Sequence, residues 1–270
     1  MGLGYSTPFL NVGSAYMYPD LDKAKRAVKR LGESIKIDGL PPQLAPLVFV
    51  FTGTGNVSKG AREVFELLPH KMVDPSVLSL LFGAADGKGC AAGGSVESCT
   101  KRAKYIEGLE DCDFSREVIG TVVKAEHMVE LKSGLSRSSS SGDFKNKSVE
   151  FDRERYQRSP GDFDPTFHRD IAPYASVIVT GHYWDPRFPR LLTSEQLRAL
   201  REASSDENAL YLSPQSSSSD PALTPKRPLL VADLTCDIGG SMEFLTHTTE
   251  PHAPFYLVKP TEEGEPSLEG

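Results

Sequence analysis

Two closely spaced glycines follow a short apolar run near residue 50. Residues 47–61 read LVFVFTGTGNVSKGA, in which Gly53 and Gly55 separate the apolar run from a segment with helix-forming character. Because glycine has no Cβ, Gly53 suits a tight turn and Gly55 lets a phosphate approach the backbone. A helix that starts near Val57 would aim unpaired N–H groups and its positive dipole end at that charge. The pattern predicts a loop that holds the pyrophosphate of a dinucleotide, and an ordinary glycine turn is the alternative.

An acidic residue lies at the spacing expected for a ribose contact. Residues 71–73 read as a second short strand that ends in Asp74, about 20 residues beyond the glycines. Asp74 is therefore a candidate partner for a ribose diol, and a solvated aspartate is the alternative. The usual dinucleotide-binding fingerprint has a third glycine at the position of Ser58, so the match is incomplete. Two small residues, Gly60 and Ala61, follow it.

Strand-like and helix-like segments alternate along the chain. Strands are predicted at 47–52, 71–73, 176–180 and 229–234, and helices at 20–35, 57–68, 76–81 and 194–203. Continuous apolar strands separated by helices indicate a parallel sheet that is covered on both faces. The predicted fold class is α/β, with a Rossmann-like doubly wound parallel sheet.

Three stretches of low complexity interrupt this alternation. They are predicted as surface insertions at about 84–101, 133–165 and 204–228, rich in glycine, alanine, serine or proline. Because such compositions bury little apolar area, we expect these insertions to be mobile. Regulatory phosphorylation of their serine tracts is an alternative role.

Composition limits the classes of function. The chain has 270 residues, 39% of them hydrophobic, and a formal net charge of −7 without a basic stripe, so nucleic acid is not expected as a partner. No apolar stretch approaches the roughly 20 residues that span a bilayer, and the N-terminus lacks the pattern of a secretory signal. We therefore expect an intracellular protein, cytoplasmic or mitochondrial, that does not enter a membrane.

Cysteine usage argues against metal and disulfide chemistry. The four cysteines are Cys90, Cys99, Cys112 and Cys236. They form no CxxC pair and have no histidine at ligand spacing. We expect reduced thiols and no metal site.

A second chemical signal follows the predicted strand at 229–234. Residues 234–241 read LTCDIGGS, which places Asp237 where a parallel strand reaches its carboxyl end and where ligands bind in open α/β sheets. A turn residue before two glycines is the alternative for Asp237. Tyr183 follows the strand at 176–180 in the same way and is a candidate to cover the nicotinamide side of a cofactor. A buried aromatic at a strand end is the alternative for Tyr183.

Several separate motifs occur in the order typical of one enzyme family. They are LGYSTPF (3–9), VFVFTGTGNVSKGA (48–61), IAPYA (171–175), YW (183–184), PRLLT (189–193) and TCDIGGSMEF (235–244). Together they resemble the lysine-ketoglutarate reductase half of alpha-aminoadipic semialdehyde synthase, which is related to lysine-forming saccharopine dehydrogenases and more distantly to alanine dehydrogenase and the transhydrogenase nucleotide domain. The resemblance runs from about residue 3 to about Tyr256, broken only by the three insertions.

The resemblance implies an oxidoreductase of lysine metabolism. The family interconverts lysine plus 2-oxoglutarate with saccharopine, using NAD(H) or NADP(H). By resemblance, the cofactor-binding residues are Gly53, Gly55, Ser58, Lys59, Asp74, Tyr183 and Leu234, and the saccharopine pocket is lined by Thr235, Cys236 and Asp237. Gly53, Gly55, Ser58 and Lys59 would hold the phosphates, Asp74 the adenosine ribose, and Tyr183 and Leu234 the nicotinamide end.

The choice between the two coenzymes stays open from the sequence. Asp74 disfavours a 2′-phosphate, whereas His70 and Lys71 lie close enough to offset that effect. The animal enzymes that this chain resembles use NADPH with an acidic residue at the same place.

The resemblance also implies a domain organisation. Residues 1–40 would lead from an N-terminal substrate domain that precedes the chain, residues 41–258 would form the NAD(P)-binding domain, and residues 259–270 would be a tail. In the family, the lysine and histidine that do acid/base work belong to that preceding domain. We therefore name no catalytic residue in this chain and expect the chain alone to be inactive. The alternatives are a non-catalytic nucleotide-binding or regulatory fragment and an alanine dehydrogenase- or transhydrogenase-like NAD(H) domain, although the TCDIGGS segment argues against the latter.

Overall fold

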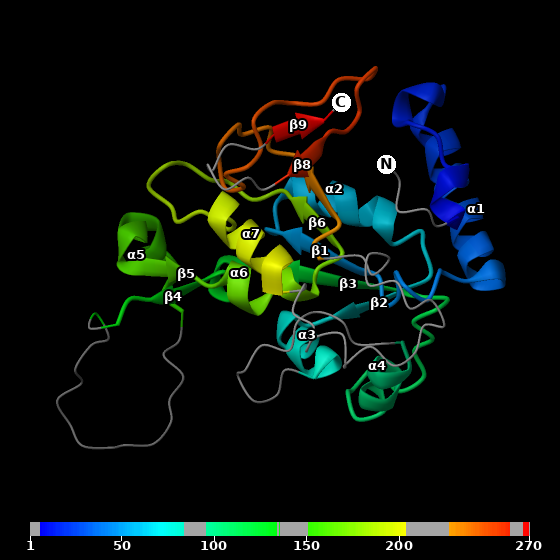
Figure 1. Cartoon of the computed structure of the whole chain (residues 1–270), viewed down its shortest axis with the longest axis horizontal. Helices are drawn as coiled ribbons and strands as arrows, with labels where there is room; N and C mark the ends of the chain where they lie inside the picture. The colour runs from blue at the N-terminus through cyan, green and yellow to red at the C-terminus, as the bar shows by residue number, and fades with distance from the viewer. Residues whose placement is uncertain are drawn as a thin grey trace.

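The centre of the protein is a sheet of five parallel strands. The computed structural model describes residues 6–83, 96–133, 135, 151–203, 227–259 and 267–269. The strand order is β2-β3-β1-β6-β7 (Figure 1). The strands are β1 (Val48–Thr52), β2 (His70–Val73), β3 (Val118–Val123), β6 (Val177–Thr180) and β7 (Leu230–Asp233). The α/β class with a Rossmann-like, doubly wound parallel sheet is therefore confirmed.

Strand β1 lies in the middle of the sheet. It pairs with β3 in a register that aligns Thr52 with Val123, and with β6 in a register that aligns Val50 with Ile178. Strand β2 pairs with the other side of β3 and has no pairing with β1. Strand β3, which the sequence analysis did not predict, thus separates the glycine strand from the strand that ends at Asp74.

Helices cover both faces of the sheet. The helices are α1 (Leu21–Asp38), α2 (Asn56–Phe65), α3 (Pro75–Phe82), α4 (Val96–Ala103), α5 (Arg153–Arg158), α6 (Phe167–Asp170) and α7 (Ser194–Ala203), with short 3-10 turns between some of them. One buried cluster joins α1 and α2 to the sheet, and a second joins α3, α4, α6 and α7 to it. The helices of the two clusters lie on opposite sides of the strands in Figure 1.

The side chains of β1 explain why both faces are covered. Val48 and Val50 belong to the cluster with α3, whereas Phe51 belongs to the cluster with α1 and α2. Successive side chains of a strand point to opposite faces, so a continuous apolar run requires cover on both sides. At about 25 cal/mol per Å² of apolar surface, each fully buried valine or phenylalanine stabilises the fold by roughly 1.5–3 kcal/mol.

Two of the predicted insertions are partly built into the fold. Within 84–101, residues 84–95 lie outside the described residues, but α4 begins at Val96 and buries Cys99. Within 133–165, most of 134–150 lies outside the described residues, whereas α5 is a helix and β5 (Phe163–Pro165) pairs with β4 (Val129–Leu131). These parts of the predicted insertions are elements of the fold, because their few apolar residues pack against the core.

The end of the third predicted insertion is also part of the core. Residues 204–226 lie outside the described residues, but Arg227 is only 9% exposed. Its guanidinium donates to the carbonyl oxygens of Pro46 at 2.8 Å and Tyr174 at 3.1 Å, and to Ser176 Oγ. Because a buried cation is costly unless its donors are paired, this arrangement ties the amino ends of β1, β6 and β7 together.

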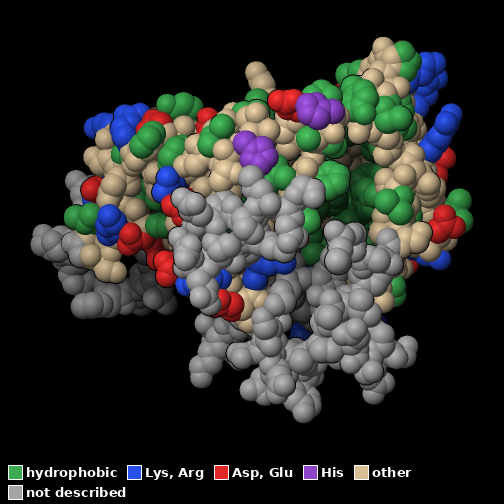
Figure 2. Space-filling model, turned by 45° about the horizontal axis from the view of Figure 1, so that its top comes forward, with side chains coloured by type: hydrophobic (Ala, Val, Ile, Leu, Met, Phe, Trp, Pro, Cys, Tyr) green, Lys and Arg blue, Asp and Glu red, His purple; other side chains and the backbone are tan. Residues whose placement is uncertain are grey.

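Apolar side chains also remain at the surface. Leu234, Ile238 and Phe255, which follow β7, are 45%, 62% and 75% exposed. Figure 2 shows apolar side chains gathered around a hollow on one face of the molecule. Beyond this segment, β8 (Leu257–Lys259) and β9 (Ser267–Glu269) form a small antiparallel pair within and beside the predicted tail. Among the described residues, no helix combines the length and apolar character needed to cross a membrane.

Candidate functional site

The carboxyl ends of β1 and β6 form the topological switch point of the sheet. From β1 the chain continues to β2 and β3 on one side of the sheet, and later to β6 and β7 on the other. In open α/β sheets, ligands bind in the crevice at such a point. Gly53 follows β1 and Gly181 follows β6, so a glycine lies on each side of the crevice.

Gly53 occupies a position that no other residue fits without strain. Its φ is +80°, and a Cβ there would lie 3.1 Å from the Cα of His182 and 3.3 Å from the carbonyl oxygen of Gly181. Gly55 differs, because its φ is −72° and a Cβ there would meet nothing within 4 Å among the described residues. Gly53 therefore closes the turn, while Gly55 leaves open space above the backbone, as the phosphate-loop prediction requires.

The start of helix α2 offers backbone donors to this open space. Gly55 is the N-cap of α2 and has no side chain to accept from the first turn. In contrast, Asp20 caps α1 and Asp74 caps α3 through their carboxylates. The first N–H groups of a helix lack intrahelical partners, so α2 presents donors and a positive dipole end to an anion.

Close packing between α2 and the sheet comes from Gly181 and not from a third glycine in the loop. A Cβ on Gly181 would lie 3.1 Å from the backbone nitrogen of Ser58, and Ser58 is 1% exposed. The Ser58 hydroxyl is buried and has no hydrogen-bond partner among the described residues. The departure at Ser58 is thus compatible with the fold, because the partner strand supplies the missing small residue.

A cavity of about 320 Å³ opens over the glycine loop. It is lined on one side by Gly53, Gly55 and Lys124, and on the other by His182 and Tyr183. Tyr183 is 77% exposed, so the alternative that it is a buried aromatic is wrong. Its hydroxyl donates to Asp185 at 2.9 Å, and the exposed side chain lines the cavity.

His182 joins the ends of β1 and β6. Its Nδ1 is hydrogen-bonded to Thr52 Oγ1 at 2.7 Å, and the N–H of Gly181 donates to the same oxygen at 3.2 Å. Burial lowers the pKa of His182 to about 4, and Asp233 and Asp237 act weakly in the opposite direction. His182 is therefore neutral near pH 7 and cannot act there as a general acid.

A second cavity of about 330 Å³ lies beyond β7 and contains most of the predicted substrate residues. Leu234, Cys236 and Asp237 line it, whereas Thr235 turns away and donates to Asp233 Oδ1 at 2.8 Å. Asp237 also starts a turn, since its carbonyl oxygen accepts from the N–H of Gly240 at 2.9 Å, so the turn interpretation is confirmed. Cys236 has a φ of 60°, a strained value for a residue with a side chain.

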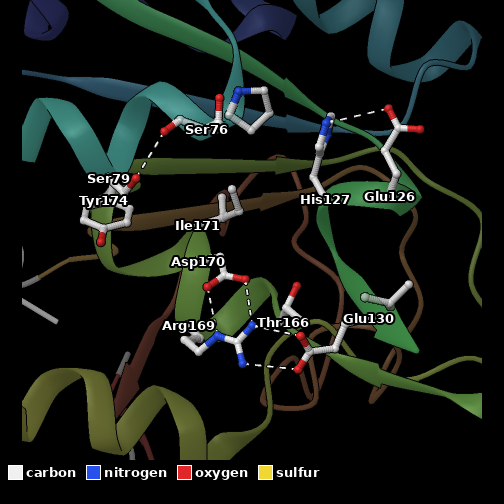
Figure 3. Close-up of a pocket in the computed structure, with 12 residues that line it drawn as sticks. Ser76, Ser79, Glu126, His127, Glu130, Thr166, Arg169, Asp170, Ile171 and Tyr174 are labelled. Carbon is white, nitrogen blue, oxygen red and sulfur yellow. Dashed lines mark hydrogen bonds and ion pairs between the residues drawn. The ribbon is translucent and has the colours of Figure 1, made fainter. Parts of the chain in front are cut away.

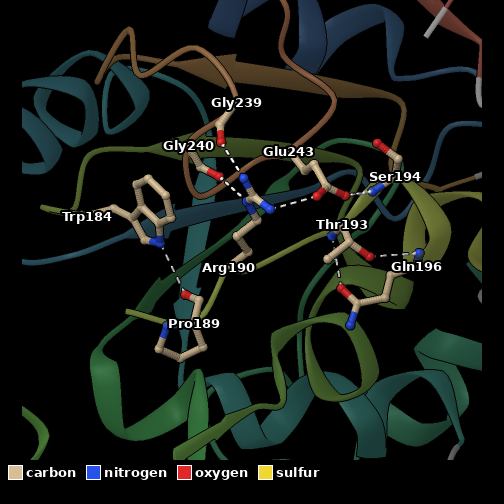
Figure 4. A network of polar contacts seen from close by, with 9 residues as sticks. All are labelled: Trp184, Pro189, Arg190, Thr193, Ser194, Gln196, Gly239, Gly240 and Glu243. Atoms are coloured by element: carbon tan, nitrogen blue, oxygen red, sulfur yellow. Dashed lines mark hydrogen bonds and ion pairs between the residues drawn. The ribbon is translucent and has the colours of Figure 1, made fainter. Parts of the chain in front are cut away.

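Arg190 holds the glycine turn that follows Asp237 in place. Its guanidinium donates to the carbonyl oxygens of Gly239 at 3.0 Å and Gly240 at 3.2 Å, and to Glu243 at 2.7 Å (Figure 4). The cation also lies 5.9 Å from the centre of the Trp184 ring. The PRLLT and TCDIGGSMEF motifs are therefore joined in space, which explains why both accompany the site.

The remaining thiols are poorly suited to chemistry. Burial raises the pKa of Cys99 to about 11 and that of Cys112 to about 12. Neither forms the thiolate needed for nucleophilic attack near pH 7.

Cys99, Cys112 and Cys236 are free thiols, and Cys90 lies outside the described residues. In the described part of the chain, no three His, Cys, Asp or Glu side chains gather as a metal site would require.

Three predicted cofactor residues, Ser58, Lys59 and Asp74, line neither of these two cavities. Lys59 is on the exposed side of α2 and lines neither cavity. Asp74 follows β2 and accepts from the backbone nitrogen of Ser76 at 3.0 Å and from its hydroxyl at 2.6 Å. These hydrogen bonds hold the pKa of Asp74 below its usual value. The structure thus separates Asp74 from the glycine loop by the width of strand β3.

A third cavity, of about 530 Å³, lies beside the start of α3 (Figure 3). Its cation, Arg169, donates to both carboxylate oxygens of Glu130 at 3.3 Å and to Asp170 at 2.9 Å and 3.1 Å. Two carboxylates thus neutralise the one arginine of the cavity. Glu126 lines this cavity and also the one over the glycine loop.

Comparison with known proteins identifies relatives of the chain. No family model matches it. It is 39% identical over 260 residues to alpha-aminoadipic semialdehyde synthase of Arabidopsis thaliana, and 31% identical over 258 and 262 residues to the mitochondrial synthases of Bos taurus and Mus musculus. The alignments cover 95–96% of this chain and 20–22% of the relatives.

The chain is homologous to this synthase. It spans about a fifth of the length of the synthases that it matches, so it corresponds to one part of them. The resemblance predicted from the motifs is confirmed at this level. The sequence did not reveal Gly181, Lys124 or Arg190 as residues of the candidate site. Of these three, only Arg190 belongs to one of the family motifs, PRLLT.

Proposed function

We propose that this chain is the nucleotide-binding part of a lysine-ketoglutarate reductase, which binds a nicotinamide dinucleotide over the Gly53–Gly55 loop. The observation that carries the proposal is the position of that loop at the switch point of a parallel sheet, with Gly53 forced to be glycine and Gly55 facing open space. Homology to a part of the synthase and the motifs of its reductase half support the same conclusion.

The residues present fit such a coenzyme. Gly55 and the uncapped start of α2 offer N–H groups to the pyrophosphate, and Tyr183 lies at the mouth of the same cavity. Bound there, the coenzyme would exchange the hydride that interconverts saccharopine with lysine and 2-oxoglutarate. Leu234 lines the neighbouring cavity, and by the family resemblance it would contact the nicotinamide end of the coenzyme.

The second cavity suits the substrate. Asp237 is a carboxylate that can pair with the ammonium group of the lysyl part of saccharopine, because a charge-assisted hydrogen bond is stronger than a neutral one. Cys236 and Thr235 shape the same turn. Arg190 fixes the turn from behind and acts as a positioning residue.

The test is dinucleotide binding by the 270-residue chain. Trp184, the only tryptophan, adjoins Tyr183, so its emission reports on the site. We expect titration with NADPH or NADH to change that emission and calorimetry to give one site per chain. We also expect no lysine-dependent oxidation of either coenzyme by this chain alone, because no residue of the chain is assigned as the general acid or base for the imine. Failure to bind either coenzyme would overturn the proposal, and binding without turnover after addition of a substrate domain would favour a non-catalytic module.

A further inference from the structure

Two criteria for the residue that contacts the coenzyme's ribose give different answers in this protein. One is the spacing from the glycines along the sequence, and the other is the strand that lies beside the glycine strand in the sheet. In the usual Rossmann strand order, 3-2-1-4-5-6, the second strand lies beside the glycine strand, so the ribose contact about 20 residues on also lies at the end of the neighbouring strand. Asp74 has the usual spacing from the glycines, but it follows β2. The strand beside β1 is β3, and its last residue, Val123, is aligned with Thr52.

The residue that follows β3 is a lysine. The N–H of Gly53 donates to the carbonyl oxygen of Val123 at 2.8 Å, so Lys124 begins where the glycine turn begins. Lys124, Glu126 and Arg153 line the cavity over the glycine loop, and Asp74 does not. The ammonium group of Lys124 is 3.3 Å from Glu126, and the Lys124 side chain is 56% exposed.

Asp74 already serves as the N-cap of helix α3. Its carboxylate accepts two hydrogen bonds from Ser76 and thereby caps helix α3. A ribose diol would have to compete for these oxygens and reach across the end of β3. Its position therefore favours a structural role.

We propose that Lys124, at the end of β3, contacts the adenosine ribose and selects a coenzyme that carries a 2′-phosphate. This inference rests on the proposed function, because it names a specificity residue of the same site. A phosphate monoester carries a charge of about −1.5 to −2 near pH 7, and lysine is a common point-charge partner for it. Arg153 adds a second cation to the cavity wall, and the Lys124 ammonium would exchange its exposed pair with Glu126 for the phosphate.

The experiment compares fragments that differ only in the 2′-phosphate. Calorimetry of the 270-residue chain with 2′,5′-ADP and with AMP isolates the adenosine half of the site. We expect Lys124→Ala to weaken 2′,5′-ADP about tenfold and AMP less than about twofold, since a charge-assisted hydrogen bond to phosphate is lost. NADPH should lose affinity relative to NADH by a similar factor.

Two control variants make the result specific. Lys101 forms a comparable surface pair with Glu97 on α4 and lines none of the three cavities, so Lys101→Ala should leave both affinities unchanged. Asp74→Asn keeps a good helix cap and removes only the charge, so it should change the ratio of NADPH to NADH affinity less than about threefold.

The outcomes separate this inference from the proposed function. Equal losses of 2′,5′-ADP and AMP in Lys124→Ala, or no loss of either, would overturn the role of Lys124 while dinucleotide binding stands. A large rise of the NADPH to NADH ratio in Asp74→Asn would return the ribose site to β2 and also overturn it. Absence of any dinucleotide binding by the unmodified chain would overturn both proposals.

Discussion

Replacing Gly55 with valine should weaken coenzyme binding while the protein still folds. The φ of −72° at Gly55 is accessible to valine, and its Cβ would meet no described atom within 4 Å. Valine is a poorer N-cap than glycine, which costs about 0.5–1 kcal/mol of stability. The folded structure should therefore remain intact.

The effect on the coenzyme should be much larger. The valine methyl groups would occupy the space through which the pyrophosphate approaches the start of α2. Loss of two backbone hydrogen bonds to phosphate, at about 1.5 kcal/mol each, weakens affinity by about 3 kcal/mol, or about 100-fold in Kd. Calorimetry gives the affinity, and urea unfolding gives the stability of the same preparation.

Gly60 provides a matched control on the same helix. It is exposed, and a Cβ there also meets nothing within 4 Å among the described residues. Gly60→Val should leave the affinity within about twofold and raise stability by a few tenths of a kcal/mol, because valine is a better helix former than glycine. If Gly55→Val binds the coenzyme as tightly as Gly60→Val does, the assignment of the phosphate loop is refuted.

Two further predictions concern the surroundings of the loop. Because burial lowers the pKa of His182 to about 4, against about 6.5 in an unfolded chain, its contribution to stability is full above pH 6.5 and is lost as the pH falls toward 4. Between pH 7 and pH 4, the free energy of unfolding of the unmodified protein should therefore fall by up to about 3 kcal/mol more than that of His182→Asn. Urea unfolding at several pH values measures this difference, and identical pH profiles would contradict the prediction. Arg190→Lys loses the forked contact with Gly239 and Gly240, so it should destabilise the protein by about 1–2 kcal/mol and shift the emission of Trp184. Unchanged stability and emission together would show that Arg190 does not hold the turn.

Much of the fold was predictable because buried parallel strands have a simple sequence pattern. Strands β1, β6 and β7 coincide with the apolar runs at 47–52, 176–180 and 229–234 to within a residue or so, and α7 has the predicted bounds of 194–203. These elements are apolar on the faces that they bury, so the local pattern and the tertiary structure agree.

Strand β3 was missed because Gly120 interrupts its apolar run. Glycine weakens a strand on its own, and so it reads as a break in the pattern. In the structure, a Cβ on Gly120 would lie 2.6 Å from the ring of Phe65 and 2.5 Å from the sulfur of Met72. The glycine is thus required by the close approach of α2, which is a tertiary contact that no local pattern contains.

The sequence predicted the loops that form the candidate site, but it did not predict which strands lie beside them in the sheet. Gly53 and Asp237 both lie at the carboxyl edge of the sheet, as expected from the strands that precede them. Spacing along the chain could not reveal that β3 lies between β1 and β2, because strand order depends on how the connections cross the sheet. Lys124 was therefore invisible as a site residue until β3 and its register were known.

The central place of β1 affects how the polypeptide acquires its structure during synthesis. Both strands that flank β1 come later in the chain, and the N–H of Val48 bonds to Ser176 Oγ across 128 residues of sequence. Closing such long loops costs entropy before any contact compensates for it, which slows folding. As the ribosome releases the chain, the two edges of β1 stay unpaired until β3 and then β6 emerge, and this apolar strand is the segment that a chaperone would need to shield.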